Sequence, residues 1–277
     1  MTEVIDGHAH VWVLDPERYP WHQTLASVPI PQRAASAEEL LGHMDAAGID
    51  RTLLLQPSVY GFDNSYLCDA ADRYPDRFVA VCVVNPHAPG AGDDLRYWCR
   101  ERGCCGVRVN LIEDGTADWL AAPDQQGLWE AAGELGIPVS LQMRPDHATG
   151  VRQLARAYPA IRFIADYLGR EAAHDGTGAA ALRLLSEEQN ICTKLLAAGQ
   201  DSDEGYPFRD LWPLYQAAVD AFGASRVMFG SEFPHVLAHC RYRDATQLLS
   251  TLPFLDERDR KLIGAGTALE IYRFDRS

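Results

Sequence analysis

Short apolar runs recur along the whole chain, and their alternation with longer amphipathic segments strongly limits the folds open to it. The runs are apolar on both alternating faces, which is typical of parallel strands covered by helices. Eight strands are therefore expected. Val4–Ile5 opens the first, and the others are at Arg51–Gln56, Phe78–Val84, Cys105–Asn110, Pro138–Gln142, Ile161–Asp166, Ile191–Leu195 and Arg226–Gly230.

A predicted helix follows each of these runs. The first is expected between Ser36 and Ala47, because Ser36 and Glu39 form a capping box and Gly48 can end the helix. The others are expected at Asn64–Tyr74, Asp93–Arg102, Gln126–Leu135, Gly150–Tyr158, Ala179–Glu188 and Phe208–Phe222, with two more from about Arg241 and over Glu257–Tyr272.

This order predicts an α/β fold, and in particular a (β/α)8 TIM barrel. Successive strand–helix units form right-handed parallel βαβ connections, and eight of them fit a chain of 277 residues. A doubly wound open sheet is the main alternative, but no G-x-G-x-x-G fingerprint follows the first strand. No linker or change of composition divides the chain, so residues 1–277 are expected to form a single domain.

Charge and composition exclude several classes of partner. The chain has 25 Lys and Arg against 39 Asp and Glu, a net charge of −14, which argues against binding to nucleic acid or to anionic lipid. No secretory signal and no apolar run near 18 residues is visible, so a cytoplasmic protein without a membrane segment is expected. The seven cysteines show no C-x-x-C pair and are expected to be reduced core thiols.

The active site of such a barrel lies where its strands end, so the polar residues at these points are the candidates. The first strand leads into Asp6-Gly7-His8-Ala9-His10, where His8 and His10 should face the same way. Two imidazoles there can bind a metal or polarise an oxyanion. The eighth strand leads into Glu232, a candidate general base whose pKa burial would raise, and then into His235.

Other strand ends add weaker candidates. Arg108 and Asn110 share one face of the fourth strand, and a buried Arg there needs an acid or an anionic substrate as its partner. Single polar residues also follow the other strands, and the candidate substrate contacts among them are Tyr60, Asn64, Gln142 and Arg144, beside Asp166, Tyr167 and Lys194 at the same level. Asn64 has an alternative as a helix cap.

Four stretches carry a resemblance to a known family: I-D-G-H-A-H-V-W, L-L-L-Q-P-S-V-Y-G-F-D-N, G-V-R-V-N-L and V-M-F-G-S-E-F-P-H. In this order and spacing they resemble the amidohydrolase superfamily, and more narrowly its lactonase-type branch. The resemblance implies a barrel that acts on a carbonyl group, with His8 and His10 as the pair on the first strand. It also implies that Arg108 contacts a substrate carboxylate. Members of the branch differ in metal use.

The sequence departs from this family pattern at two places that matter chemically. The usual D-H-L-G is here Asp166-Tyr167-Leu168-Gly169, and the usual G-S-D-W-P is here Gly230-Ser231-Glu232-Phe233-Pro234. A phenol binds zinc poorly, and a glutamate carboxylate reaches further than that of aspartate. A site without metal is therefore favoured. If a divalent ion such as zinc or manganese is present, its ligands would be His8, His10 and Glu232.

Three functions are open on these grounds. The first is a lactonase-like hydrolase of a small cyclic ester or related carbonyl compound, with Glu232 as general base and His8, His10 and Tyr167 as donors to the oxyanion. The second is a non-hydrolytic acid–base enzyme, namely a cyclase, isomerase or decarboxylase. The third is a binding barrel without catalysis. A small, possibly anionic substrate is the expected partner, and a homodimer is possible.

Overall fold

The expected barrel is confirmed by the structure, a computed structural model that describes residues 3–22, 30–112, 117–166 and 175–274. Eight strands form one parallel sheet in the order β1 to β8. The sheet curls until the chain after β8 meets β1, where the His10 amide donates to the Phe233 carbonyl at 2.7 Å. The strands are β1 (Ile5–Ala9), β2 (Arg51–Leu55), β3 (Phe78–Val83), β4 (Gly106–Asn110), β5 (Val139–Gln142), β6 (Phe163–Asp166), β7 (Ile191–Leu196) and β8 (Val227–Gly230).

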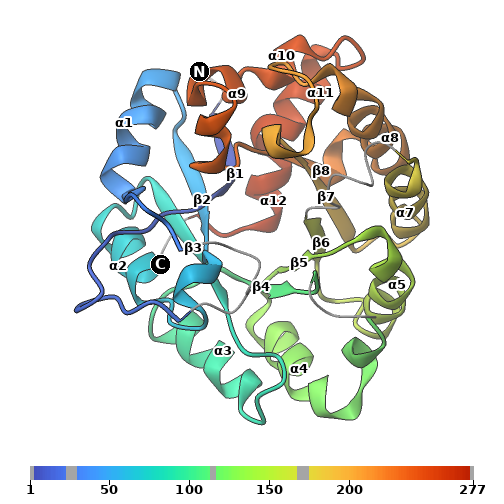
Figure 1. Ribbon diagram of the computed structural model, residues 1–277. Helices are drawn as coiled ribbons and strands as arrows, with labels where there is room; N and C mark the ends of the chain where they lie inside the picture. The colour runs from blue at the N-terminus through green and yellow to red at the C-terminus, as the bar shows by residue number, and fades with distance from the viewer. Residues whose placement is uncertain (1–2, 23–29, 113–116, 167–174, 275–277) are drawn as a thin grey trace.

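Helices surround this sheet as a ring (Figure 1). They are α1 (Ala37–Ala47), α2 (Ser65–Arg73), α3 (Ala91–Arg100), α4 (Gln126–Leu135), α5 (Ala148–Ala157), α7 (Thr177–Ser186), α8 (Trp212–Phe222), α9 (Tyr242–Thr246), α10 (Leu248–Thr251), α11 (Glu257–Lys261) and α12 (Thr267–Ile271). Short 3-10 turns lie at η1 (Ser58–Tyr60), η2 (Asp118–Ala121), η3 (Pro123–Gln125), η4 (Pro145–His147), η5 (Gly199–Asp201), η6 (Arg209–Leu211), η7 (Ala224–Arg226) and η8 (His235–Ala238).

Several boundaries differ from those expected. The first strand was expected to begin at Val4–Ile5 and to lead into His8 and His10, whereas β1 begins at Ile5, runs to Ala9 and carries His8 within it. The helix expected over Glu257–Tyr272 is divided, because a π-helical stretch, η9 (Leu262–Gly266), separates α11 from α12. Apolar periodicity placed these elements well but did not show where hydrogen bonding changes within them.

The first helix shows how far a local signal can be trusted. Ser36 caps α1 by accepting a hydrogen bond from the Glu39 amide at 3.2 Å, and Gly48 ends it with φ at 75°. Glu39 does not complete the capping box, because its carboxylate pairs with Arg33 at 2.9 Å. The helix start was thus predicted correctly, while the partner of Glu39 was decided by a neighbouring loop.

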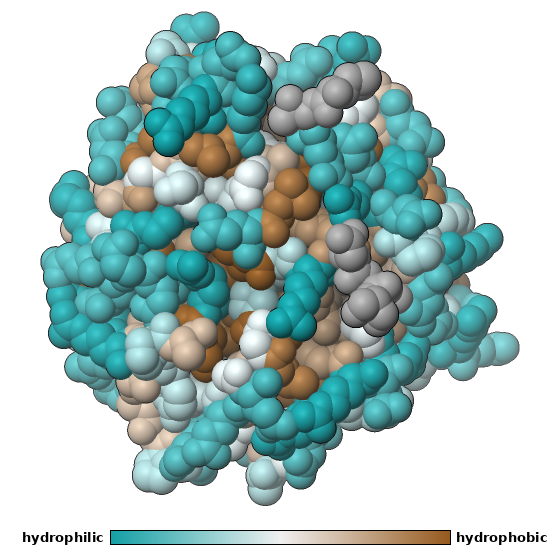
Figure 2. Space-filling model, turned by 180° about the vertical axis from the view of Figure 1, so that it is seen from behind, coloured by the Kyte–Doolittle hydropathy of each residue, from teal (hydrophilic) through white to brown (hydrophobic). Residues whose placement is uncertain are grey.

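Apolar side chains form two separate clusters. The larger lies between the strands and the surrounding helices and includes Leu54, Trp129 and Phe163. The smaller joins inward-facing strand residues such as Leu53 and Ile164 to Tyr272 and Phe274 from the end of the chain. Figure 2 shows the face opposite to that of Figure 1, where hydrophilic side chains cover most of the surface around scattered apolar ones. Because the residues of the second cluster come from the inward faces of the strands, this cluster fills the interior of the barrel.

The seven cysteines are free thiols, and Cys68, Cys82, Cys104 and Cys192 among them are buried, as expected for reduced core residues. Within the described ranges, none of the helices combines the length and the apolar character needed to cross a bilayer.

Candidate active site

A β-bulge in β1 places the two histidines inside the mouth, by which we mean the end of the barrel where its strands finish. Asp6 pairs with Thr52 and Ala9 with Leu54, so that Gly7 and His8 together oppose a single residue of β2. The expectation that His8 and His10 face the same way is correct, because their Nε2 atoms are 3.1 Å apart.

Two glycines make room for this arrangement. A Cβ atom on Gly7 would lie 2.5 Å from the Phe229 carbonyl oxygen, and one on Gly230 would lie 2.4 Å from the Cβ atom of His8. Neither contact is possible for a side chain, so β1 and β8 can approach closely only because both positions lack one. The approach brings Glu232, just after β8, next to β1.

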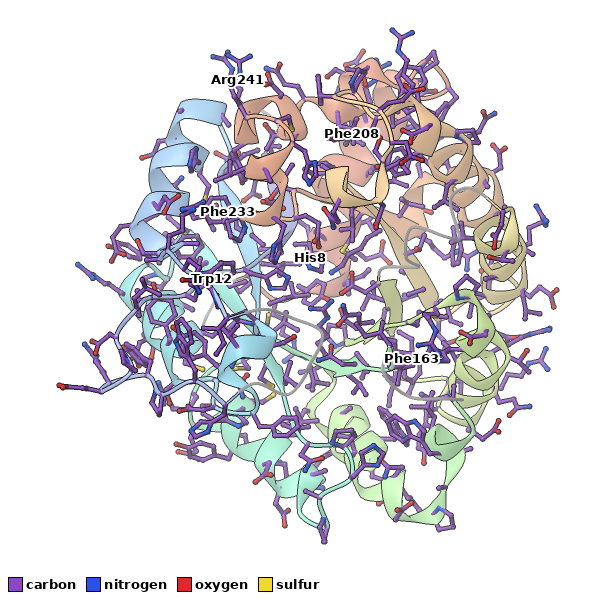
Figure 3. All side chains as sticks on the ribbon, in the orientation of Figure 1. His8, Trp12, Phe163, Phe208, Phe233 and Arg241 are labelled. Carbon is purple, nitrogen blue, oxygen red and sulfur yellow. The ribbon has the colours of Figure 1, made fainter. Side chains whose placement is uncertain are left out.

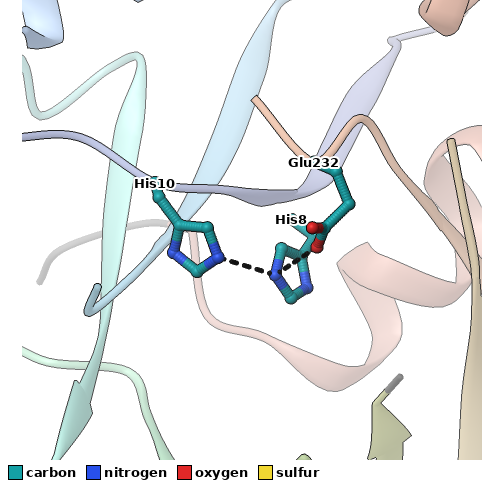
Figure 4. Close-up of side chains that lie close together, drawn as sticks. All are labelled: His8, His10 and Glu232. Atoms are coloured by element: carbon teal, nitrogen blue, oxygen red, sulfur yellow. Dashed lines mark hydrogen bonds and ion pairs between the residues drawn. The ribbon is translucent and has the colours of Figure 1, made fainter. Parts of the chain in front are cut away.

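His8, His10 and Glu232 form a buried cluster at this junction, drawn in Figure 4. His8 Nε2 is 2.8 Å from Glu232 Oε1 and 3.1 Å from His10 Nε2. Figure 3 places His8 near the middle of the helix ring, with Trp12 and Phe233 on the side of α1. Three residues predicted from two ends of the sequence thus meet at a single point.

His10 has a defined protonation state in this cluster. Its Nδ1 lies 2.8 Å from the Leu55 carbonyl oxygen, which can only accept, so Nδ1 carries the proton and Nε2 keeps its lone pair. Burial lowers the pKa of His10 well below its ordinary value, and the neighbouring His8 lowers it further. His10 is therefore a neutral imidazole that offers a lone pair to the mouth.

On its other side, His8 faces a group of buried charges. Its Nδ1 is 3.1 Å from Asp166 Oδ1 and 3.2 Å from Lys194 Nζ. Asp166 also lies 3.5 Å from Lys194 and 3.4 Å from the Nε atom of Arg108. His8 thus lies between the carboxylates of Asp166 and Glu232 with Lys194 beside it, and Arg108 joins the group through Asp166. Such a cluster is stable in a protein interior only while its members remain paired.

These contacts decide the charge states. Burial opposes a charge on His8, but the carboxylates of Asp166 and Glu232 outweigh it and raise the pKa of His8. Burial also disfavours the charge on Asp166, yet His8, Lys194 and Arg108 hold the pKa of Asp166 below its ordinary 3.8. Burial lowers the pKa of Lys194, which Asp166 partly offsets.

The expected pKa of Glu232 was wrong in direction. Burial does raise it, as predicted, but the charge of His8 and its contact with the carboxylate lower the pKa of Glu232 below its ordinary 4.5. The sequence showed that Glu232 would be buried, but it did not show that an imidazole would face it. Glu232 is thus an ionised carboxylate at neutral pH, and a weaker base than an unpaired one.

Both histidines have the contacts that are typical of metal ligands. The Nδ1 atom of each, which faces away from the cluster, meets a hydrogen-bond acceptor. His8 Nδ1 faces a carboxylate and His10 Nδ1 a carbonyl oxygen, the pattern that orients histidine ligands. The inner nitrogens and Glu232 offer ligand atoms that all lie within 4.8 Å of one another. The three ligands named from the sequence can therefore hold a divalent cation, although the chemistry of the set does not choose between zinc and manganese.

Two further candidates lie beside this cluster. Asn110 pairs in register with Gln142, and Gln142 with Asp166, across three adjacent strands. The amide oxygens of Asn110 and Gln142 are buried and have no hydrogen-bond partner among the described residues. An unpartnered buried acceptor is costly, so a donor is expected there when the site is filled.

His235 borders the cluster from η8. Its ring lies 5.9 Å from that of His10 and 5.8 Å from that of Trp12. Its ring is thus placed beside His10 at the edge of the mouth, although the sequence offered His235 equally as a loop histidine.

The remaining candidates are elsewhere. Tyr60 bonds to Val13 and Asn64 to the backbone of Val83, so both side chains hold loops in place. Arg144 is held by the Ile112 carbonyl oxygen and by Asp146 and does not join the cluster. Tyr167 lies outside the described residues.

Sequence reasoning noted Asp166 and Lys194 at strand ends but did not place them in the site. The signal was available, because a lysine or aspartate within an otherwise apolar strand must find a partner. What was missing was the partner's identity, since Lys194 meets His8 across 186 positions of sequence.

The chain is an eight-stranded parallel barrel with a cluster of histidine and carboxylate side chains at its mouth. These features define a class of enzymes that use such a cluster to bind a metal or to transfer protons. Comparison with known proteins narrows this class. The model of the amidohydrolase family matches residues 5–274, and the chain therefore belongs to that family.

The individual relatives share only about a quarter of their residues with this chain. The chain is 26% identical to L-fucono-1,5-lactonase of Burkholderia ambifaria, over 100% of this chain and 97% of the relative. It is 28% identical to 4-sulfomuconolactone hydrolase of Hydrogenophaga intermedia, over 83% and 74%. A probable 2-pyrone-4,6-dicarboxylic acid hydrolase of Acinetobacter baumannii has the same fold, with a TM-score of 0.82, 22% identity and coverage of 98% and 99%. The expected amidohydrolase resemblance is confirmed.

Proposed function

We propose that this protein hydrolyses a small lactone in the mouth of the barrel. The observation that carries the proposal is the meeting of His8, His10 and Glu232 beside the cations Arg108 and Lys194. Ester hydrolysis needs a group that activates water and positive charge near the carbonyl oxygen, and this cluster supplies both. Membership of the amidohydrolase family, and two relatives that act on lactones, support the same reaction.

Substrate binding follows from the charges and acceptors of the mouth. Arg108 and Lys194 attract the carbonyl oxygen or a carboxylate of the substrate. The open amide oxygens of Asn110 and Gln142 accept hydrogen bonds from its hydroxyl groups. Asp166 pairs with both cations and holds them in place before the substrate binds. An anionic substrate must therefore compete with this buried carboxylate for them.

Water attack is assigned to Glu232. Its Oε1 lies 2.8 Å from His8 Nε2, and its Oε2 accepts a longer hydrogen bond, at 3.4 Å, from the side-chain Nε2 of Gln200, so both oxygens of the carboxylate are held in place. The ionised carboxylate orients water and takes its proton as the water oxygen attacks the lactone carbonyl carbon. The ring C–O bond then breaks, and the proton returns to the leaving ring oxygen. The open hydroxy acid departs and the carboxylate is restored.

A bound divalent metal would be held by His8, His10 and Glu232, and it would supply Lewis acidity toward the lactone carbonyl.

The assay measures hydrolysis of L-fucono-1,5-lactone, 4-sulfomuconolactone and a simple unsubstituted lactone by the release of acid. Glu232→Gln is expected to lower kcat by at least about 100-fold with little change in KM, because it removes the proton acceptor and preserves size. Glu204→Gln is the matched control, since Glu204 is exposed near the same end of the barrel. Turnover in ¹⁸O-water should label the product carboxylate, and an unlabelled product would favour the non-hydrolytic alternative.

Metal content by plasma mass spectrometry, before and after chelation, accompanies the assay. Loss of activity with the metal and its return on adding zinc or manganese would assign the cluster to a metal. Full activity without metal would assign the same residues to acid–base work alone. A protein that opens none of these lactones in either state would contradict the proposed function.

A further inference from the structure

We propose that Asp6 and Ser231 are positioning residues that hold Glu232 against His8. The inference rests on the proposed function for its kinetic consequence, but the geometry it concerns stands independently. Neither side chain was among the candidates at the strand ends. Asp6 precedes the bulge of β1, and its carboxylate bonds to Ser231 and Tyr242.

Asp6 is a fully buried carboxylate that ties two distant segments together. Its Oδ1 accepts from the Ser231 amide at 2.8 Å and from the His8 amide at 3.1 Å. Its Oδ2 accepts from the Ser231 hydroxyl at 2.5 Å and from the Tyr242 hydroxyl of α9 at 2.9 Å. Four donors thus satisfy one carboxylate, and two of them are backbone amides, that of His8 and that of Ser231, the residue before Glu232.

Ser231 extends this link to the far side of Glu232. Its hydroxyl oxygen accepts from the Phe233 amide at 3.0 Å while donating to Asp6. The Glu232 amide itself donates to the His8 carbonyl at 3.0 Å. The residues on both sides of Glu232 are therefore held by one side chain, and Glu232 is held to β1.

Glu232 needs such restraint because its backbone is strained. Its φ is 61°, in the left-handed region that a residue with a Cβ atom rarely adopts. In an unrestrained loop the chain would relax to a negative φ and swing the carboxylate away from His8. The Asp6–Ser231 pair supplies the hydrogen bonds that make this conformation the stable one, so the 2.8 Å contact between Glu232 and His8 depends on it.

The test compares two serine-to-alanine variants. Ser231→Ala removes the hydroxyl beside Glu232. Ser140→Ala is the matched control, because Ser140 is also fully buried and its hydroxyl is also bonded, to Tyr272 in the barrel interior. We expect Ser231→Ala to lower kcat at least about tenfold with KM nearly unchanged, and Ser140→Ala to keep kcat within about threefold. The crystal structure of Ser231→Ala should show Glu232 withdrawn from His8.

Asp6→Asn is the second variant, for use if Ser231→Ala does not fold. It keeps the size of Asp6 but exchanges one acceptor for a donor, and the same loss of kcat and the same withdrawal of Glu232 are expected. Unchanged kcat together with an unmoved Glu232 would overturn the inference. If the unaltered protein opens no lactone while the variant structure still shows Glu232 displaced, the proposed function fails and the positioning role stands.

Discussion

Among single residues, the charge states of this site are decided by which side chains face one another. Glu232 and Asp166 are both buried, which taken alone raises the pKa of a carboxyl group. Both have lowered pKa values, because His8 lies between them and Lys194 and Arg108 lie beside Asp166. The site is thus a set of mutually dependent charges, and removing one member leaves the others unpaired in a medium that solvates them poorly.

This dependence predicts how stability varies with pH. Asp166 has a folded pKa below its ordinary 3.8, so its contribution to stability is present above that value and is lost as pH falls through the folded pKa. In metal-free protein, we expect Asp166→Asn to lower the free energy of unfolding by about 3–5 kcal/mol at pH 7. The difference from the unaltered protein should not shrink between pH 7 and about pH 5, and it should shrink below about pH 4.

Urea denaturation of both proteins between pH 3.5 and 8 measures this difference. A difference that already shrinks between pH 7 and pH 5 would show that the carboxyl of Asp166 titrates near neutrality. The charged contacts with Lys194 and Arg108 would then not hold in solution.

Within single elements, close backbone approaches determine how neighbouring elements fit. The β1 bulge needs Gly7 and Gly230, and the α3–α4 pair needs Gly92 in the same way. A Cβ atom on Gly92 would lie 2.4 Å from the Gly127 carbonyl oxygen of α4. Arg96 and Arg100 of α3 pair with Glu134 of α4, so the two helices are joined at a short separation by contacts of both kinds.

Alanine substitutions in two helices should therefore have opposite signs. We expect Gly92→Ala to lower the free energy of unfolding by about 1–3 kcal/mol, because α3 and α4 must separate. Gly42→Ala in α1 should raise it by up to about 1 kcal/mol, since no atom lies within 4 Å of the new methyl group and the unfolded chain loses freedom. Urea denaturation of the two variants checks both signs. Equal effects would show that helix propensity, rather than the approach of the helices, dominates.

For the molecule as a whole, the end of the chain closes the barrel interior. Tyr272, next to α12, belongs to the inner apolar cluster with Leu53 and Ile164, and its hydroxyl lies 3.2 Å from Ser140 Oγ. Tyr272 thus packs the interior of the barrel with apolar residues and adds no residue to the cluster of His8, His10 and Glu232.

Truncating the Tyr272 side chain should destabilise the fold. Tyr272→Ala is expected to cost about 3–5 kcal/mol, because it leaves a large cavity among residues that cannot collapse into it. Tyr272→Phe removes only the hydrogen bond and should cost about 1 kcal/mol. The free energies of unfolding of the two variants test this ranking. A small loss for Tyr272→Ala would mean that the C-terminal segment detaches from the barrel without consequence.

The sequence alone determined the architecture and named the residues that meet at the centre of the candidate site. Eight apolar runs alternating with helices allow few arrangements other than a barrel, and a barrel brings every strand end to one mouth. His8, His10, Glu232 and Arg108 could therefore be named before any contact was known. The strand limits were less certain, because β1 continues through a bulge that pairing with β2 creates.

Only the tertiary structure decided the electrostatics and the support of the site. Lys194 and Asp166 face His8, and Asp6 reaches Ser231 across 225 positions of sequence. Tyr60 and Asn64 hold loops, whereas the sequence offered both as substrate contacts and Asn64 also as a helix cap. The physical reason is that a pKa or a hydrogen bond belongs to a pair of groups in space, whereas a sequence pattern reports only which residue types are buried and on which face.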